Sequence, residues 1–150
     1  MHPQYWIDMT IAFWVKVPVS ATADTVILEV WYDGEKKDEV KQTNTAASGV
    51  EGLGQWQLVV VEYYTESTST QMKRIIRSRY RNGTTLGTFN ETASDVAGFE
   101  LPSTDPVGLD LYKTKVILGN SAADQIKFCK IFFDAFSDKT ENSIEELGYG

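Results

Sequence analysis

The sequence of 150 residues contains one cysteine, Cys129, and one histidine, His2. A single cysteine excludes an internal disulfide, and the clustered Cys and His ligands of a structural zinc site are also missing. Catalysis by a Ser-His-Asp or Cys-His arrangement needs a positioned imidazole, whereas we expect His2 to lie in a frayed terminus. Cys129 alternates with Phe128 and Lys130 in an apolar run, which favours a small buried strand residue over a reactive thiol.

An excess of positive charge and long apolar runs are absent as well. The net charge of −7 argues against a general nucleic-acid binder, because phosphate contacts require a positive surface. No stretch reaches the ~20 apolar residues of a membrane span, so we expect no membrane insertion. The first residues lack a basic segment followed by an apolar run, so we expect no signal peptide and interpret the chain as one excised domain of a longer protein.

No long amphipathic helix is indicated, and the dominant pattern is period-two alternation, which is typical of β-strands. Two polar stretches, 35–54 and 90–113, are expected to be mainly loops, the first with a weak edge strand near Val40. Asn82-Gly83 predicts a two-residue type I′ turn. The predicted strands cover 9–17, 26–32, 56–64, 72–81, 84–89, 115–118 and 126–136, and the predicted core includes Phe13, Val15, Val59, Val61, Ile131 and Phe133. Many short strands separated by turns predict a single all-β domain over 1–150, a two-sheet antiparallel sandwich.

Four segments in order resemble the laminin-G-like jelly-roll domains of the concanavalin A-like lectin/glucanase superfamily. They are TIAFWVK at 10–16, WQLVVVEY at 56–63, RYRNGT at 79–84 and KIFFDAF at 130–136. The resemblance spans almost the whole chain and implies a two-sheet jelly roll. It implies no particular ligand, because this fold serves lectins, adhesion modules, hydrolases and structural domains. The family strand that precedes the first segment is short or missing here, which leaves a sheet edge for a partner chain to complete.

Hydrolases with this fold carry acids in the pattern E-x-D-x-x-E, which places a nucleophile close to a general acid. The nearest equivalent is Glu29, Asp33 and Glu35, but Trp31 occupies the middle position and Asp33 belongs to an Asp-Gly turn. We therefore expect no catalytic residues and no enzymatic activity.

Calcium is the one cofactor that the resemblance raises, because laminin-G-like domains often bind it with loop oxygens. The possible ligands are Asp105, Asp110, Asn120 and Asp124, with Asp95 as a further donor. They form no spaced motif, and ordinary solvated loop acids are the alternative interpretation.

A local reversal of charge occurs at Lys73, Arg74, Arg77, Arg79 and Arg81. Arg77, Arg79 and Arg81 are expected to share an outward face of their strand. They either contact an anionic partner, such as a sulfated glycan or an acidic protein, or form a solvated face that discourages edge pairing. The residues between them, Ile76, Ser78 and Tyr80, are then expected to face the core.

Aromatic rings and sequons complete the candidate sites. Tyr112 is grouped with the arginines as a ligand or partner surface, and Trp31, Tyr32, Tyr63 and Tyr64 either stack on sugars or pack in the core. Asn82-Gly83-Thr84 and Asn90-Glu91-Thr92 match the N-glycosylation sequon, which favours secretion.

The favoured function is a non-catalytic recognition or adhesion module that binds a glycan or a protein at a cell surface or in the extracellular space. The alternative is a structural module packed against partner subunits in a larger assembly. A glycoside hydrolase is the remote third possibility.

Overall fold

The computed structural model describes residues 5–6, 8–16, 25–41, 54–66, 69–82, 85–86, 90–101, 109–119 and 125–132. Within them, the one helical element is a 3₁₀ turn, η1 (Leu111–Lys113), and everything else that is regular is strand. The strands are β1 (Tyr5–Trp6), β2 (Met9–Lys16), β3 (Val26–Tyr32), β4 (Glu35–Lys41), β5 (Trp56–Tyr64), β6 (Gln71–Asn82), β7 (Thr85–Leu86), β8 (Asn90–Glu100), β9 (Leu109–Asp110), β10 (Thr114–Leu118) and β11 (Gln125–Phe132).

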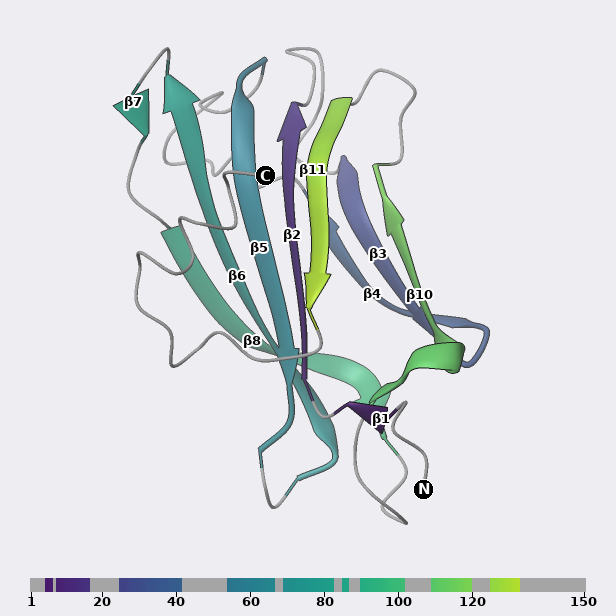
Figure 1. Ribbon diagram of the computed structural model, residues 1–150. Helices are drawn as coiled ribbons and strands as arrows, with labels where there is room; N and C mark the ends of the chain where they lie inside the picture. Colours follow the sequence, from purple (N-terminus) through teal and green to yellow (C-terminus); the bar gives the residue numbers. More distant parts are fainter. Residues whose placement is uncertain are drawn as a thin grey trace.

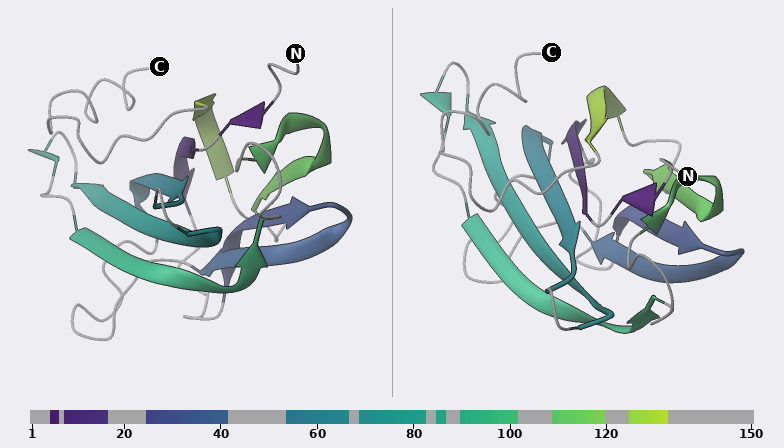
Figure 2. Two further views of the ribbon diagram at one scale, coloured as in Figure 1. Left: turned by 90° about the horizontal axis from the view of Figure 1, so that it is seen from below. Right: turned by 60° about the horizontal axis from the view of Figure 1, so that its bottom comes forward.

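The strands form two antiparallel sheets and a short β1–β9 ladder (Figure 1). The large sheet has the order β11-β2-β5-β6, and β7 and β8 both pair with the far side of β6. The small sheet has the order β10-β3-β4. Seen from below, β8 curves towards the small sheet, where it contacts β4 (Figure 2). The prediction of an all-β chain with two antiparallel sheets is confirmed.

The core lies between the two sheets and follows the predicted alternation. Phe13 and Val15 on β2, and Val59 and Val61 on β5, are fully buried as predicted. Leu28 and Val30 of β3 contribute from the small sheet, and Val96, Phe99 and Leu101 come from β8 and the residue that follows it. The prediction fails for Ile131, which is 42% exposed on the edge strand β11. Phe133 lies outside the described residues.

In the central strands β2 and β5 of the large sheet, both faces are buried. Ala12, Leu58 and Val60 alternate with the core residues and yet are 0% exposed, and Trp14 is 3% exposed. A strand buried on both sides loses its polar face, which explains why β5 contains the uninterrupted run LVVV.

The β3–β4 hairpin turns at Asp33-Gly34. Tyr32 pairs with Glu35, and the two residues between them have φ angles of 53° and 81°, the positive values of a type I′ turn. The predicted loop over 35–54 is therefore wrong for 35–41, which form β4. The expected strand near Val40 is present, and Val40 is 1% exposed. The other residues of β4 are charged, a composition typical of a protected edge.

β8 lies in a segment that the sequence predicted to be a loop, so that prediction is wrong. Its Asn, Asp, Glu, Gly and Ala residues are depleted in strands, and most of its described side chains are exposed. Its pairing with β6 includes a register shift near Gln71, and Gly98 has a φ of 76°.

The second hairpin differs from its prediction by one position. Asn82 still belongs to β6 and pairs with Thr85, so the residues between the paired positions are Gly83 and Thr84. Of the predicted return strand 84–89, the structure describes Thr85–Leu86, which form β7, and residues 84 and 87–89 lie outside the described part. Positions 83 and 84 themselves lie outside the described residues.

Candidate functional site

The arginines of β6 do not form a solvent-exposed row. Arg77 and Arg79 are only 7% and 3% exposed, which contradicts the predicted outward surface, and the side chain of Arg81 lies outside the described residues. Arg77 Nη1 is 3.3 Å from Glu62 Oε2, and Arg77 Nε donates to Glu91 Oε2 at 2.8 Å. Two carboxylates on the strands beside β6 therefore balance the charge of Arg77, the buried one of Glu62 on β5 and the exposed one of Glu91 on β8.

Two further cations of β6 are also paired internally. Lys73 Nζ lies 2.9 Å from Asp95 Oδ1, and this hydrogen bond raises the pKa of Lys73. Arg74 donates to both carboxylate oxygens of Asp38, at 2.7 and 2.9 Å, and Tyr63 donates its hydroxyl to Asp38 at 2.5 Å. This Asp38 cluster joins β4 of the small sheet to β5 and β6 of the large sheet.

The three acids of the hydrolase-like pattern, Glu29, Asp33 and Glu35, do not form one cluster: the two glutamates pair with different lysines and Asp33 lies in a turn. Glu29 Oε1 is 3.9 Å from Lys36 Nζ, and Glu35 Oε2 is 2.9 Å from Lys37 Nζ. The hydrogen bond and charge of the lysine lower the pKa of Glu35. Asp33 lies in the turn, as predicted. Each of the three acids thus has a local structural environment of its own.

Of the four predicted calcium ligands Asp105, Asp110, Asn120 and Asp124, the structure describes only Asp110. Its Oδ1 accepts the backbone N–H of Tyr112 at 3.0 Å, which is a turn-stabilising bond, and the residue is 8% exposed. Asp95, the further donor, pairs with Lys73. Within the described part of the chain, no group of three or more His, Cys, Asp or Glu residues could hold a metal ion. Asp105, Asn120 and Asp124 lie outside it, so calcium binding remains a prediction.

The aromatic candidates separate into core and surface groups. Tyr32 packs against Phe99 with ring centroids 5.7 Å apart, and Tyr63 is 0% exposed, so both belong to the core. Trp31 is half-buried on the outer face of the small sheet, and Tyr112 is 82% exposed. Tyr64 borders a shallow depression of about 250 Å³, which is also lined by Lys73, Ala93, Ser94 and Asp95.

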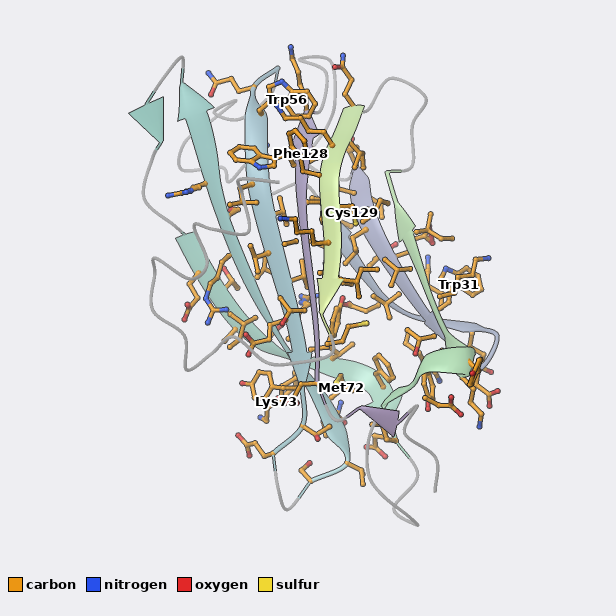
Figure 3. All side chains as sticks on the ribbon, viewed as in Figure 1. Trp31, Trp56, Met72, Lys73, Phe128 and Cys129 are labelled. Atoms are coloured by element: carbon orange, nitrogen blue, oxygen red, sulfur yellow. The ribbon has the colours of Figure 1, made fainter. Side chains whose placement is uncertain are left out.

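Trp56 and Phe128 lie near each other at the end of the large sheet opposite Lys73 (Figure 3). Lys127 Nζ lies 4.1 Å from the ring centroid of Trp56, 5.5 Å from that of Phe128 and 5.8 Å from that of Trp14. We call these four residues the aromatic–lysine cluster. Lys127 pairs with Trp14 across β11 and β2, and β5 supplies Trp56, so three adjacent strands position the cluster. An ammonium group at these distances is attracted to the negative faces of the rings.

Phe128 occupies a bulge in β11. Lys127 pairs with Trp14 and Lys130 with Ala12, so Phe128 and Cys129 together oppose one residue, Phe13. Phe128 has a φ of 53°, a left-handed conformation that costs an L residue about 1–2 kcal/mol, and its side chain is 50% exposed.

The bulge also exposes Cys129, which the sequence predicted to be buried. Partial burial of the Cys129 thiol nevertheless raises its pKa, which disfavours the reactive thiolate. The alternation through FCKIF predicts a regular strand, and no glycine marks the bulge. The sequence therefore gave no indication that Phe128 would be displaced into solvent.

The two predicted glycosylation acceptors lie on neighbouring strands. Asn82 is the last residue of β6, and Asn90, the first residue of β8, pairs with Ser78. Their side chains are outside the described set, so glycosylation remains a prediction.

Among the described residues, no helix is both long and apolar enough to cross a membrane. Comparisons with models of protein families, with curated proteins and with solved structures found no match. The laminin-G-like resemblance thus remains an interpretation of the sequence.

Proposed function

We propose that this chain is a non-catalytic recognition module, a jelly roll of the concanavalin A-like kind acting outside the cell, that binds a glycan through the aromatic–lysine cluster. The observation that carries the proposal is Phe128, which is half-exposed and held in a left-handed bulge beside Trp56 and Lys127.

The chemistry of the cluster suits a sugar. The apolar faces of a pyranose ring pack on flat aromatic side chains. Phe128 is half-exposed, and Trp56 is partly exposed with Lys127 over one face of its ring, so a sugar would pack on Phe128 and on the remaining exposed part of Trp56. The ammonium group of Lys127 between them can donate to hydroxyl groups and attract a carboxylate or sulfate. A glycan containing an acidic sugar therefore uses both properties of the cluster.

The backbone strain at Phe128 supports a role in binding. A phenylalanine in a left-handed conformation is unfavourable, and a half-exposed ring gains little from burial in return. Bulges are frequent next to binding sites because they redirect a side chain. Here the bulge directs an aromatic ring to the surface beside a second ring and a cation.

The acids highlighted by the sequence support the non-catalytic part of the proposal. Glu29 and Glu35 interact with different lysines, and Asp33 lies in a turn. None of these contacts prepares the close pair of carboxylates that glycoside hydrolysis requires.

A glycan array followed by titration calorimetry tests the proposal. The array should give selective hits, enriched in acidic glycans, and Trp56→Ala and Phe128→Asn should each weaken the best hit about tenfold or more, the equivalent of 1.4 kcal/mol. Asn tolerates a positive φ, so the second change removes the ring while retaining the bulge. Phe128→Tyr keeps a ring and should retain binding.

Ile131→Ala is the matched control, because Ile131 is an exposed apolar residue on the same strand but has no flat ring. It should leave glycan affinity unchanged. An array without selective hits, or equal affinity of the wild type and both ring variants, contradicts the proposal. A protein ligand that is weakened equally by Ile131→Ala and Phe128→Asn would instead indicate an apolar protein-binding surface.

A further inference from the structure

β2 and β11, which lie side by side in the large sheet, carry charge of one sign. Their sequences are MTIAFWVK and QIKFCKIF, which contain three lysines and no aspartate or glutamate. The whole chain has a net charge of −7, so these two strands reverse the sign of the charge locally. We call Lys16, Lys127 and Lys130 the lysine row.

The strand register places the lysine row on the outer face of the large sheet. Residues directly opposite each other in an antiparallel pair project from the same face. Ala12, Trp14 and Lys16 alternate with the core residues of β2 and therefore lie on its outer face. Lys127 lies opposite Trp14, and Lys130 lies opposite Ala12. All three lysines are partly exposed there.

The lysine row runs along the aromatic–lysine cluster. Lys16 and Lys127 are diagonal neighbours across β2 and β11, which places their Cα atoms about 7–8 Å apart. Lys130 lies opposite a β2 residue two positions from the partner of Lys127, which is about 7 Å along the strand. Lys16 also lies directly opposite Trp56, the ring that Lys127 Nζ approaches to 4.1 Å. One extended ligand on this face can therefore reach all three ammonium groups.

The lysine row also differs from lysines elsewhere in its electrostatic partners. Lys37 on β4 and Lys73 on β6 each lie 2.9 Å from a carboxylate oxygen. None of the ion pairs formed among the described residues includes a member of the lysine row. Their positive charge is thus available to a ligand of opposite charge.

We infer that the aromatic–lysine cluster binds a polyanionic glycan, one that carries carboxylates or sulfates on several of its sugars, and that Lys16 and Lys130 determine this specificity. The inference rests on the proposed function, since the rings of the cluster hold the sugars while the lysine row contacts successive acidic groups. A glycan with one acidic group can pair with only one of the three lysines.

Matched pairs of polymers test the ligand class. Polygalacturonate is compared with its methyl ester, and dextran sulfate with dextran, by titration calorimetry over a series of salt concentrations. The wild type should bind at least one anionic polymer about tenfold or more tightly than the neutral polymer of the same backbone, with an affinity that falls as salt screens the charges. The pair that shows the difference distinguishes carboxylate from sulfate. Equal affinity within both pairs would overturn the inference.

Lysine variants test the residues. Lys16→Gln and Lys130→Gln should each weaken binding of the preferred anionic polymer about threefold, and the double variant about tenfold. Lys115→Gln is the matched control, because Lys115 is an exposed lysine on the small sheet that forms no ion pair with a described residue. It should leave the affinity unchanged, and all variants should keep the melting temperature of the wild type.

The outcomes separate this inference from the proposed function. If Trp56→Ala weakens binding but Lys16→Gln/Lys130→Gln does not, the cluster binds glycans and the inference about polyanions is wrong. The inference is also wrong if Lys115→Gln weakens binding as much as Lys16→Gln, because net charge alone then accounts for the affinity. If neither Trp56→Ala nor Phe128→Asn changes the affinity, the proposed function and the inference both fail.

Discussion

Asp38 is the residue at which the polar contacts between the two sheets converge. It lies on β4, its side chain is 9% exposed, and it accepts hydrogen bonds from Arg74 and from the hydroxyl of Tyr63. These interactions cross the gap between sheets that is otherwise filled by apolar side chains. A carboxylate there fixes how β4 lies against β5 and β6, since only one arrangement satisfies both donors.

Replacing Asp38 should therefore be costly. Asp38→Ala removes the carboxylate that pairs with the Arg74 guanidinium, which is largely shielded from solvent and cannot replace this partner with water. We expect the free energy of unfolding, measured by urea denaturation, to fall by about 2–3 kcal/mol. Glu35→Ala on the same strand removes an exposed carboxylate and should leave the midpoint unchanged. Equal midpoints for wild type and Asp38→Ala would show that the Asp38 cluster does not hold the sheets together.

Tyr63 gives this cluster a dependence on alkaline pH. Burial, together with the charge of Asp38 and the hydrogen bond to it, raises the pKa of Tyr63 well above its usual value near 10. The neutral phenol is thus favoured in the folded state. The stability that Tyr63 contributes is fully present below about pH 10, the ordinary pKa of tyrosine in the unfolded state. It is lost as the pH rises from there through the higher pKa of Tyr63 in the folded state.

Tyr63→Phe removes this ionisation and should flatten the decline of stability above pH 10. Tyrosinate absorbance near 295 nm provides the direct measurement, because Tyr63 should ionise only as the protein unfolds. A wild type and a Tyr63→Phe variant with identical alkaline denaturation profiles would argue against a buried, neutral Tyr63.

At the scale of the element, β8 is held by one side chain where its pairing with β6 shifts register. The side-chain nitrogen Nε2 of Gln71 donates to the backbone carbonyl oxygen of Val96 at 2.5 Å and to that of Phe99 at 3.3 Å. The N–H of Leu101 donates to the carbonyl of Thr70 at 3.1 Å. These bonds let an edge strand with a weak strand sequence bring Val96, Phe99 and Leu101 into the core.

Gln71→Glu tests this attachment, because a carboxylate has nearly the same shape but cannot donate to either carbonyl. Amide hydrogen exchange over residues 96–101 should become faster, while exchange in β2 and β5 stays slow. Gln125→Glu changes an exposed glutamine on β11 in the same way and should have no such effect. Unchanged exchange over 96–101 would mean that pairing with β6 is sufficient to hold β8.

At the scale of the whole molecule, the alternation of apolar residues predicted the all-β class and the buried residues of β2 and β5. The alternation did not predict features that depend on which strands lie side by side in the fold. Arg77 alternates like an outward residue, and only the adjacent strands reveal that Glu62 and Glu91 match its charge. β8 is polar because it is an edge, and the same polarity predicted a loop.

The candidate site was harder to predict than the fold. Trp56 and Lys127 are far apart in the sequence, and they meet because β5 and β11 both lie beside β2. The bulge at Phe128 has no sequence marker. The aromatic–lysine cluster thus depends on strand order and on a local irregularity, and neither is encoded in the alternation of residues.

The position of β2 between β5 and β11 has a consequence for synthesis on the ribosome. Gln125 of β11 pairs with Lys16 of β2, so β2 remains without this partner until β11, the last described strand, has been translated. Until then, an edge of β2 with its buried apolar residues is unpaired in the nascent chain. Pairings between such distant segments slow folding and prolong the exposure of aggregation-prone edges. A nascent chain of this protein therefore completes its large sheet only after β11 has been translated.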